Sequence, residues 1–196
     1  MSFENRPAPG RDPHDPDLAD VRAAQEDRAA FGALYRRYLD RVYGYSFYLL
    51  GDHHDAEDVT ERTFVAALAA IDRFRDEGAT FRAWLFTIAH NQLANAIRSR
   101  QRHRTASLEA VPEPSSHADP AGSFRIADEA RGLRHALDQL ADDRRQVVVL
   151  RFVDGLTARE IGAVLGRSEG AVRVLQHRAL RQLAGLLDER AADPNV

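Results

Sequence analysis

Apolar residues recur along this chain at three- and four-residue spacing, which is the period of amphipathic helices. Between residues 20 and 49 this spacing predicts one long helix or two shorter ones, which end at Gly51. It also predicts helices over residues 55–71 and 81–104, separated by a loop at 74–80. No segment has the alternating pattern of a β-strand, so the expected fold class is all-α.

Composition divides the helical segments into two groups. Residues 1–17 are rich in proline and aspartate, a composition typical of a disordered tail. Residues 105–127 combine proline and serine with almost no periodicity and are interpreted as a flexible linker. The expected architecture is therefore two small helical domains, residues 18–104 and 128–187, with a second tail at residues 188–196.

The C-terminal domain carries the pattern of a helix-turn-helix over residues 156–187. Thr157 and Glu160 have the spacing of a capping box, Gly166 ends the first helix, and Ser168 is placed to cap the second. The second helix is rich in side chains that donate hydrogen bonds to base edges and phosphates: Arg173, Gln176, His177, Arg178, Arg181 and Gln182. The plainer alternative is a helical hairpin with a solvated basic face.

The net charge of the chain affects the interpretation of this helix-turn-helix as a DNA-binding element. The formal net charge is −3 and the isoelectric point is near 6.2, values that do not suit a protein that holds nucleic acid unaided. Either the chain does not bind DNA, or a partner assists it. An acid-free basic run at residues 98–104, far in sequence from the acidic N-terminus, favours a partner.

Several function classes find no support in the sequence. No apolar run is long enough to span a membrane and the N-terminus lacks a signal-peptide core, so we expect a cytoplasmic protein without membrane insertion. His53 and His54 stand among acids, but adjacent side chains at a helix start diverge, which favours a capped or docking acidic helix start over a metal site. No nucleophile or phosphate-loop motif appears, so no catalytic residue, cofactor, metal or small-molecule substrate is expected.

The order of these segments resembles that of extracytoplasmic-function (ECF) RNA polymerase sigma factors of the sigma-70 family, over roughly residues 20 to 187. Residues 55–60, DAEDVT, followed by Thr63 and Phe64, are similar to the helix that docks on the β′ clamp coiled coil. Residues 84–89, WLFTIA, with Asn91, are similar to the helix that faces the melted promoter. Residues 156–183 resemble the family's reader of the upstream promoter element.

The resemblance implies three groups of site residues. Those expected to bind polymerase are Asp55, Glu57, Asp58, Thr63 and Phe64, although periodicity alone places Phe64 in the buried arc of its helix. Those expected near single-stranded DNA are Phe74, Asp76, Thr80, Phe81, Trp84, Asn91 and Arg98. Those expected in the recognition helix are Ser168, Glu169, Arg173, Gln176, His177 and Arg178.

The implied partners are core RNA polymerase, through its β′ and β subunits, and promoter DNA; the resemblance leaves open whether an anti-sigma protein also binds. The implied function is to direct core polymerase to promoters and to assist their opening. A stand-alone helix-turn-helix regulator is the alternative, and it predicts operator binding without polymerase. An enzyme that uses His53 and His54 is a third class, and it predicts bound metal.

The chain departs from the family pattern at several positions. The family usually has Gln-Glu at Glu61-Arg62, arginine at His90, aspartate at Asn95, threonine at Ala171, and Ser-Arg at Val174-Leu175. We expect two phosphate or base contacts of the family to be lost in the recognition helix, which bears on promoter preference more than on function.

Overall fold

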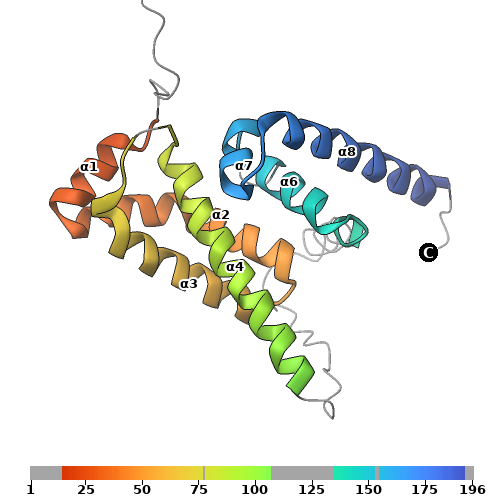
Figure 1. The fold of residues 1–196 in the computed structure, drawn as a ribbon, viewed down its shortest axis with the longest axis horizontal. Coiled ribbons are helices and arrows are strands. Elements are labelled where there is room, and N and C mark those ends of the chain that lie inside the picture. Colours follow the sequence, from red (N-terminus) through yellow and green to blue (C-terminus); the bar gives the residue numbers. More distant parts are fainter. Residues whose placement is uncertain (1–14, 77, 107–134, 153–154, 193–196) are drawn as a thin grey trace, which may run out of the picture.

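The computed structural model describes residues 15–76, 78–106, 135–152 and 155–192, and for 103–106 and 187–192 it describes the helical backbone alone. These ranges contain helices and turns but no strand, which confirms the all-α prediction (Figure 1). None of the helices in the described ranges has the length and apolar character needed to cross a membrane. The helices are α1 (Leu18–Glu26), α2 (Phe31–Leu50), α3 (His53–Ala70), α4 (Phe81–Ala106), α6 (Asp142–Phe152), α7 (Ala158–Leu165) and α8 (Glu169–Ala192), with 3-10 turns at Arg28–Ala30 (η1) and Ile71–Arg73 (η2).

Polar side chains and a glycine mark the ends of helices in the N-terminal domain. Of the two forms predicted for residues 20–49, the structure has two helices, separated at Asp27, whose side chain accepts the Ala29 N–H at 2.9 Å. Gly51 ends α2 with a left-handed backbone (φ +76°), as its place after the last apolar residue predicts. The Asp52 side chain then accepts the Asp55 N–H at 3.0 Å and caps α3.

The last residues of the predicted N-terminal tail belong to this domain. Asp15 and Asp17 are buried, and one Asp15 carboxylate oxygen accepts the Phe81 N–H at 2.6 Å, at the start of α4. Asp17 accepts hydrogen bonds from Tyr38 and Arg37 on α2. The predicted boundary at residue 17 therefore has to be corrected, because these carboxylates satisfy donors of the folded domain. Residues 1–14 lie outside the described residues.

The helix-turn-helix has the local features that its sequence predicts. The Thr157 hydroxyl accepts the Glu160 N–H at 3.2 Å while Glu160 accepts the Thr157 N–H at 2.8 Å, a complete capping box at the start of α7. Gly166 ends α7 with φ +63°, and the Ser168 hydroxyl accepts the Ala171 N–H at 3.2 Å. At Gly162 a Cβ atom would lie 2.6 Å from the Arg167 carbonyl oxygen, so the tight turn requires glycine there.

The predicted linker, residues 105–127, lies outside the described residues except for its first two, which extend α4 to Ala106. The predicted start of the second domain at Asp128 also lies outside them. Leu137 and Leu140, which the periodicity places on the apolar side of the next helix, are buried.

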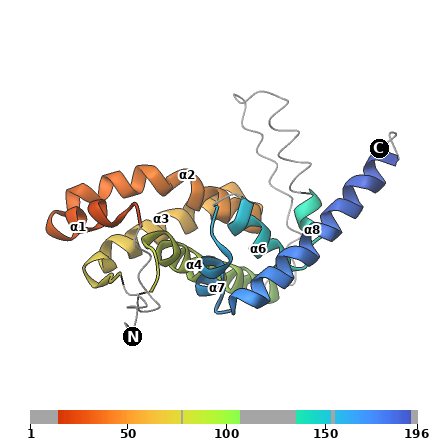
Figure 2. The same cartoon turned by 90° about the horizontal axis from the view of Figure 1, so that it is seen from above.

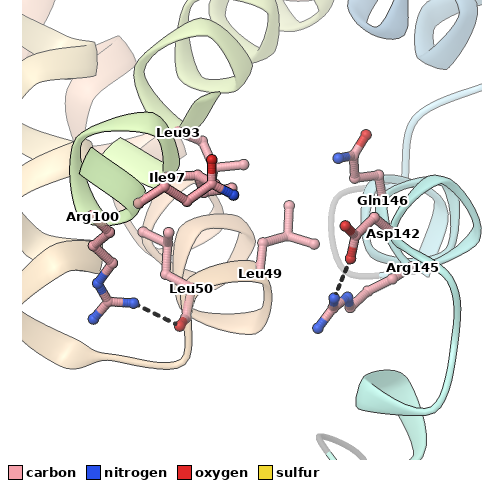
Figure 3. A pocket seen from close by; sticks show the side chains of 9 residues that line it. Leu49, Leu50, Leu93, Ile97, Arg100, Asp142, Arg145 and Gln146 are labelled. Atoms are coloured by element: carbon pink, nitrogen blue, oxygen red, sulfur yellow. Dashed lines mark hydrogen bonds and ion pairs between the residues drawn. The ribbon is translucent and has the colours of Figure 1, made fainter. Parts of the chain in front are cut away.

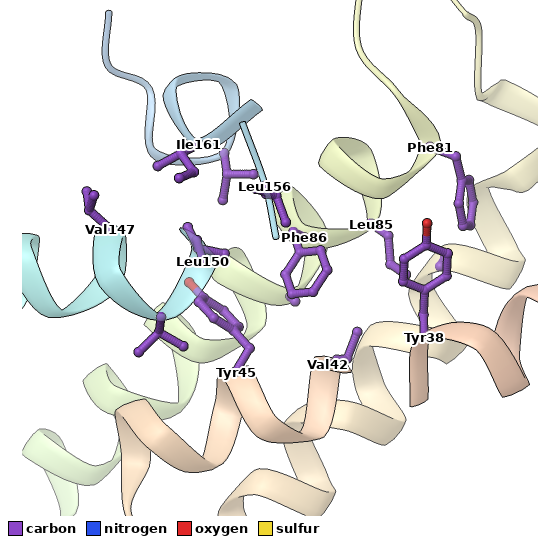
Figure 4. Close-up of a cluster of buried hydrophobic side chains, with 14 of the residues drawn as sticks. Tyr38, Val42, Tyr45, Phe81, Leu85, Phe86, Val147, Leu150, Leu156 and Ile161 are labelled. Atoms are coloured by element: carbon purple, nitrogen blue, oxygen red, sulfur yellow. The ribbon is translucent and has the colours of Figure 1, made fainter. Parts of the chain in front are cut away.

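The two domains pack against each other. Helix α7 lies against α4, and α6 lies against α2 (Figures 1 and 2). Tyr45 and Phe86 of the first domain join Leu150, Leu156 and Ile161 of the second in one cluster of fully buried side chains (Figure 4). The described protein is therefore a closed arrangement with a shared apolar core.

The domain interface is less complete toward the C-terminal ends of α2 and α4. A cavity of about 280 Å³ lies there between an apolar wall from the first domain and a polar wall from α6 (Figure 3). Its lining includes Leu49, Leu93 and Ile97 on one side and Asp142 and Arg145 on the other. The tight packing of the interface is thus concentrated around Phe86, near the start of α4.

Candidate polymerase and nucleic-acid interfaces

Helix α3 presents a charged face to solvent. Glu57, Asp58, Glu61 and Arg62 are exposed along it, at the three- and four-residue spacing of one helix face. Arg62 bonds to Asp58 at 3.1 Å, so the arginine that departs from the family pattern compensates one acid of this face. Because both side chains stay about 60% exposed, this face can bind a partner without rearrangement of the core.

Three residues expected to bind polymerase have other roles in this structure. Thr63 is fully buried and donates to the Val59 carbonyl oxygen at 2.6 Å. Phe64 is buried against Phe31 and Tyr35, with ring centroids 6.4 and 4.8 Å away. In this arrangement both side chains form part of the core of the domain, and a direct contact of either residue with polymerase stays a prediction.

Asp55, the third of these residues, is tied to α4. Its carboxylate lies 2.5 Å from the Arg100 guanidinium, which is also 3.7 Å from Asp52. This ion pair links the start of α3 to the basic end of α4. Asp55 therefore makes a contact within the domain, while Glu57 and Asp58 are exposed. Polymerase binding by these three residues stays a prediction.

The two histidines at the start of α3 point to different neighbours. The His53 ring bonds to the Tyr43 hydroxyl and packs on Phe47 at 4.4 Å between ring centroids, whereas His54 lies 3.9 Å from Glu57 on the exposed side. Among the residues whose placement is described, no group of three or more histidine, cysteine or acidic side chains is arranged to hold a metal ion.

The loop before α4 is anchored by an aromatic cluster. Phe74 lies 5.9 Å from Phe81 and 5.4 Å from Trp84, between ring centroids. Phe74 and Phe81 are buried, while Trp84 is half-buried. In this arrangement the two phenylalanines hold the loop, and Trp84 is the ring that reaches the surface. A contact of Phe74 or Phe81 with single-stranded DNA stays a prediction.

Thr80 and Arg82 connect this loop to the helix-turn-helix domain. Thr80 caps α4 by accepting the Ala83 N–H at 3.2 Å, and its hydroxyl donates to Glu160 at 2.7 Å. Arg82 donates to both oxygens of the same carboxylate, at 2.9 and 2.7 Å. We call this contact between Thr80, Arg82 and Glu160 the interdomain latch. Asp76, half-buried, lines a small pocket beside it.

Glu160 serves both domains at once. Its carboxylate accepts the Thr157 N–H within the capping box and the donors of Thr80 and Arg82 across the interface. Burial acts to raise the pKa of Glu160, but the hydrogen bonds from Thr157, Thr80 and Arg82 outweigh it and lower the pKa below its ordinary value. The latch therefore holds an ionised carboxylate with several donors.

Beyond the loop, α4 carries a polar row that stays exposed. Asn91, Asn95 and Arg98 follow one another at helical spacing, and Arg98 donates to Asn95 at 2.6 Å. His90, where the family usually has arginine, is half-buried with its ring nitrogen 3.1 Å from the Tyr45 hydroxyl, and burial lowers its pKa. The row can therefore meet a nucleic-acid strand, whereas His90 faces the domain interior.

The recognition helix α8 is exposed on the side that the sequence predicts. Val172, Leu175 and Ala179 are buried, while the opposite face is in solvent. That face carries Arg173, His177 and Arg178, with Gln176 half-buried at its edge. Arg173 is paired with Glu169, one turn earlier, at 2.5 Å, so Glu169 orients this arginine at the start of the helix.

The sequence did not predict the contacts of Arg82 with Glu160 or of Asp15 with the start of α4. The capping-box pattern pointed to Glu160, but its partners Thr80 and Arg82 lie 80 and 78 residues away in the sequence. The acidic N-terminal cluster did include Asp15, yet nothing in its spacing indicates that it caps α4.

The two domains match two known sequence families. Residues 34–103 match Sigma-70 region 2 and residues 136–184 match Sigma-70, region 4. The chain is 38% identical over 171 residues to the ECF RNA polymerase sigma factor BldN of Streptomyces coelicolor, spanning 87% of this chain and slightly under two thirds (65%) of BldN. It is 32% identical over 190 residues to the ECF RNA polymerase sigma factor SigE of Mycolicibacterium smegmatis, spanning 94% of this chain and 72% of SigE.

Solved structures give the same fold. CnrH, in complex with the cytosolic domain of CnrY, is 30% identical with a TM-score of 0.65 over 90% of this chain and 99% of CnrH. The sigma factor RpoE from Bartonella quintana, in complex with the anti-sigma factor NepR, is 28% identical with a TM-score of 0.67 over 81% of this chain and 96% of RpoE.

A region 2 domain followed by a region 4 helix-turn-helix defines the class of sigma-70-type transcription initiation factors. Within that class, the chain belongs to the ECF RNA polymerase sigma factors.

Proposed function

We propose that this sigma factor binds core RNA polymerase through the exposed face of α3 and reads the upstream promoter element with α8. In the same proposal, the polar row of α4 follows the melted strand while the promoter opens. The observation that carries the proposal is that one chain presents two separate elements suited to nucleic acid, the cationic face of α8 and the row Asn91, Asn95 and Arg98 on α4.

The docking surface consists of the exposed acids Glu57, Asp58 and Glu61 with Arg62. Thr63 and Phe64 lie on the opposite, buried side of α3 and anchor the helix in the core of the domain. A partner surface rich in basic residues would complement the acids of this face, and we propose that this surface is on the β′ subunit. Region 4 then contacts the β subunit and DNA.

The closed arrangement has to open before the chain works on a promoter. Thr80, which is expected near single-stranded DNA, is bonded to Glu160 of the helix-turn-helix domain, and Arg82 donates to the same carboxylate. A strand that enters this loop has to displace α7. We propose that core polymerase separates the domains. Because the net charge of the chain is −3, we expect the chain alone to bind DNA weakly.

The solved relatives suggest a partner for the closed form. The structure of RpoE was solved in complex with an anti-sigma factor, and that of CnrH in complex with the cytosolic domain of CnrY. For this chain we propose that an anti-sigma protein, by contacting both domains, stabilises the packing of α7 on α4. In this account the sigma factor acts in the cytoplasm by binding alone and has no active site of its own.

Promoter binding with and without core polymerase tests the proposal. Labelled duplexes selected by the reconstituted holoenzyme are titrated with the chain alone, with core alone and with both. Sequence-specific binding is expected only with both, and a duplex with a scrambled upstream element is the control. Tight specific binding by the chain alone, as a dimer on paired half-sites, contradicts the proposal and identifies a stand-alone regulator.

A further inference from the structure

An exposed valine lies on the outward face of the recognition helix. Val174 is 50% exposed, although its neighbours Val172 and Leu175 are buried in the core of the domain. It is not one of the buried residues of that core, and valine, being β-branched, is a weaker helix former than most residues. Val174 is therefore a candidate for contact with another molecule.

The surroundings of Val174 fit the major groove of DNA. Gly170, Val174 and Arg178 follow one another at four-residue spacing, so they lie along one face of α8. Around Gly170 no atom lies within 4 Å of an added Cβ, so the first turn of the helix presents bare backbone and can approach another molecule closely. Arg173, His177 and Arg178 are exposed beside the valine and suit a polyanion.

The major groove offers an apolar side chain one kind of apolar group to contact. The major-groove edges of the bases carry hydrogen-bonding groups, and the apolar group among them is the C5 methyl of thymine. We infer that Val174 is a specificity-determining residue that packs on a thymine methyl group in the upstream promoter element. This inference rests on the proposed function, because it requires α8 to lie in the major groove.

Replacing single thymines by deoxyuridine tests the inference, because this change removes the methyl group and leaves the hydrogen-bonding edge intact. Binding of the holoenzyme is measured on promoter duplexes that carry the replacement at one upstream position at a time. For the natural chain we expect a roughly fourfold loss of affinity at one position, the size expected for one methyl group leaving an apolar contact.

Val174→Ala holoenzyme should bind the thymine and deoxyuridine duplexes equally at that position. The matched control is Leu180→Ala, which truncates another exposed apolar residue of α8 (42% exposed) and should keep the natural response. Identical responses of the natural chain and Val174→Ala at every position overturn the inference. A Val174→Ala chain that loses affinity for core polymerase also overturns it, since Val174 then contacts protein.

The test separates this inference from the proposed function. If ordinary base changes in the upstream element still weaken binding but no deoxyuridine replacement distinguishes the two chains, only the role of Val174 is wrong. If no upstream base change affects the holoenzyme, α8 does not read DNA and the proposed function fails with the inference.

Discussion

Replacing Arg82 by alanine should loosen the packing of the two domains. The guanidinium of Arg82 donates to both oxygens of Glu160 across the interface, and the two side chains are 27% and 10% exposed. Glu160 keeps its donors Thr157 and Thr80 in the variant. The substitution therefore removes an interdomain contact while the capping box that starts α7 stays intact.

The size of the effect follows from this geometry. A hydrogen bond to a charged group contributes about 1.5–3 kcal/mol. The remaining donors still bond to the Glu160 carboxylate, so the larger cost of leaving a buried charge without a partner does not arise. We therefore expect the closed arrangement to lose about 2 kcal/mol of stability relative to the open one, near the lower end of that range. This value corresponds to a shift of roughly 30-fold in the equilibrium between closed and open arrangements.

Energy transfer between two fluorophores measures this equilibrium. The chain contains no cysteine, so Ala69→Cys on α3 and Gly185→Cys on α8 provide unique attachment points on the two domains. Transfer is followed through a urea titration, so that a shift is measured even where the closed arrangement dominates. We expect transfer to be lost at lower urea in the Arg82→Ala chain than in the natural one.

The matched control is Arg28→Ala, which removes an ion pair with Asp72 that is exposed and lies within one domain. If Arg82→Ala and Arg28→Ala lose energy transfer at the same urea concentration, the latch does not hold the domains together and the reasoning is refuted.

The same contact predicts how pH affects the packing. Burial acts to raise the pKa of Glu160, but its hydrogen bonds, which include those from Thr80 and Arg82 across the interface, lower the pKa below its ordinary value. The stabilisation that Arg82 gives the closed arrangement is therefore fully present above the ordinary pKa of Glu160, and it is lost as the pH falls through the lowered value and the carboxylate is protonated. Acid should therefore reduce energy transfer in the natural chain more than in Arg82→Ala, and equal acid responses would contradict this.

Further predictions concern the other surfaces. Asp58→Lys should weaken binding to core polymerase without changing the thermal unfolding curve, since an exposed pair contributes little to stability; unchanged affinity would reject α3 as the docking face. Arg173→Ala should cost roughly 1–3 kcal/mol on the preferred upstream element and relax preference at one base pair, whereas Arg178→Ala should weaken all sequences alike; binding of holoenzyme to single-base promoter variants separates the two outcomes. Gly162→Ala should destabilise the protein by about 1–3 kcal/mol in thermal unfolding, because its Cβ meets backbone, while Gly185→Ala, in open space within α8, should be neutral or stabilising.

Local features of the fold could be predicted from the sequence because they depend on contacts a few residues apart. The capping box of Thr157 and Glu160, the helix end at Gly166 and the cap at Ser168 all follow from short-range hydrogen bonds and backbone preferences. The buried faces of α3 and α8 follow from helical periodicity in the same way. For Phe64, periodicity predicted the buried side of the helix, where the structure places the ring. The polymerase contact that the resemblance implies for Phe64 stays a prediction.

Contacts between distant segments could not be predicted from the sequence. The bond from Thr80 to Glu160 joins residues 80 positions apart, and the cap that Asp15 provides for α4 spans 66 positions. Such pairs depend on how whole helices pack, and no local pattern encodes their partners. The burial of Phe74 was missed for the same reason, because it results from the packing of the loop on Phe81 and Trp84.

Run-off transcription with purified components tests the central claim most directly. A linear template that carries a promoter selected by the holoenzyme is incubated with core polymerase, with and without this chain. We predict a transcript of one defined start site that requires the chain, and that disappears when the upstream element is scrambled. The account is contradicted if core polymerase gives the same transcripts in the presence and absence of the chain, or if the chain only blocks transcription from its binding site.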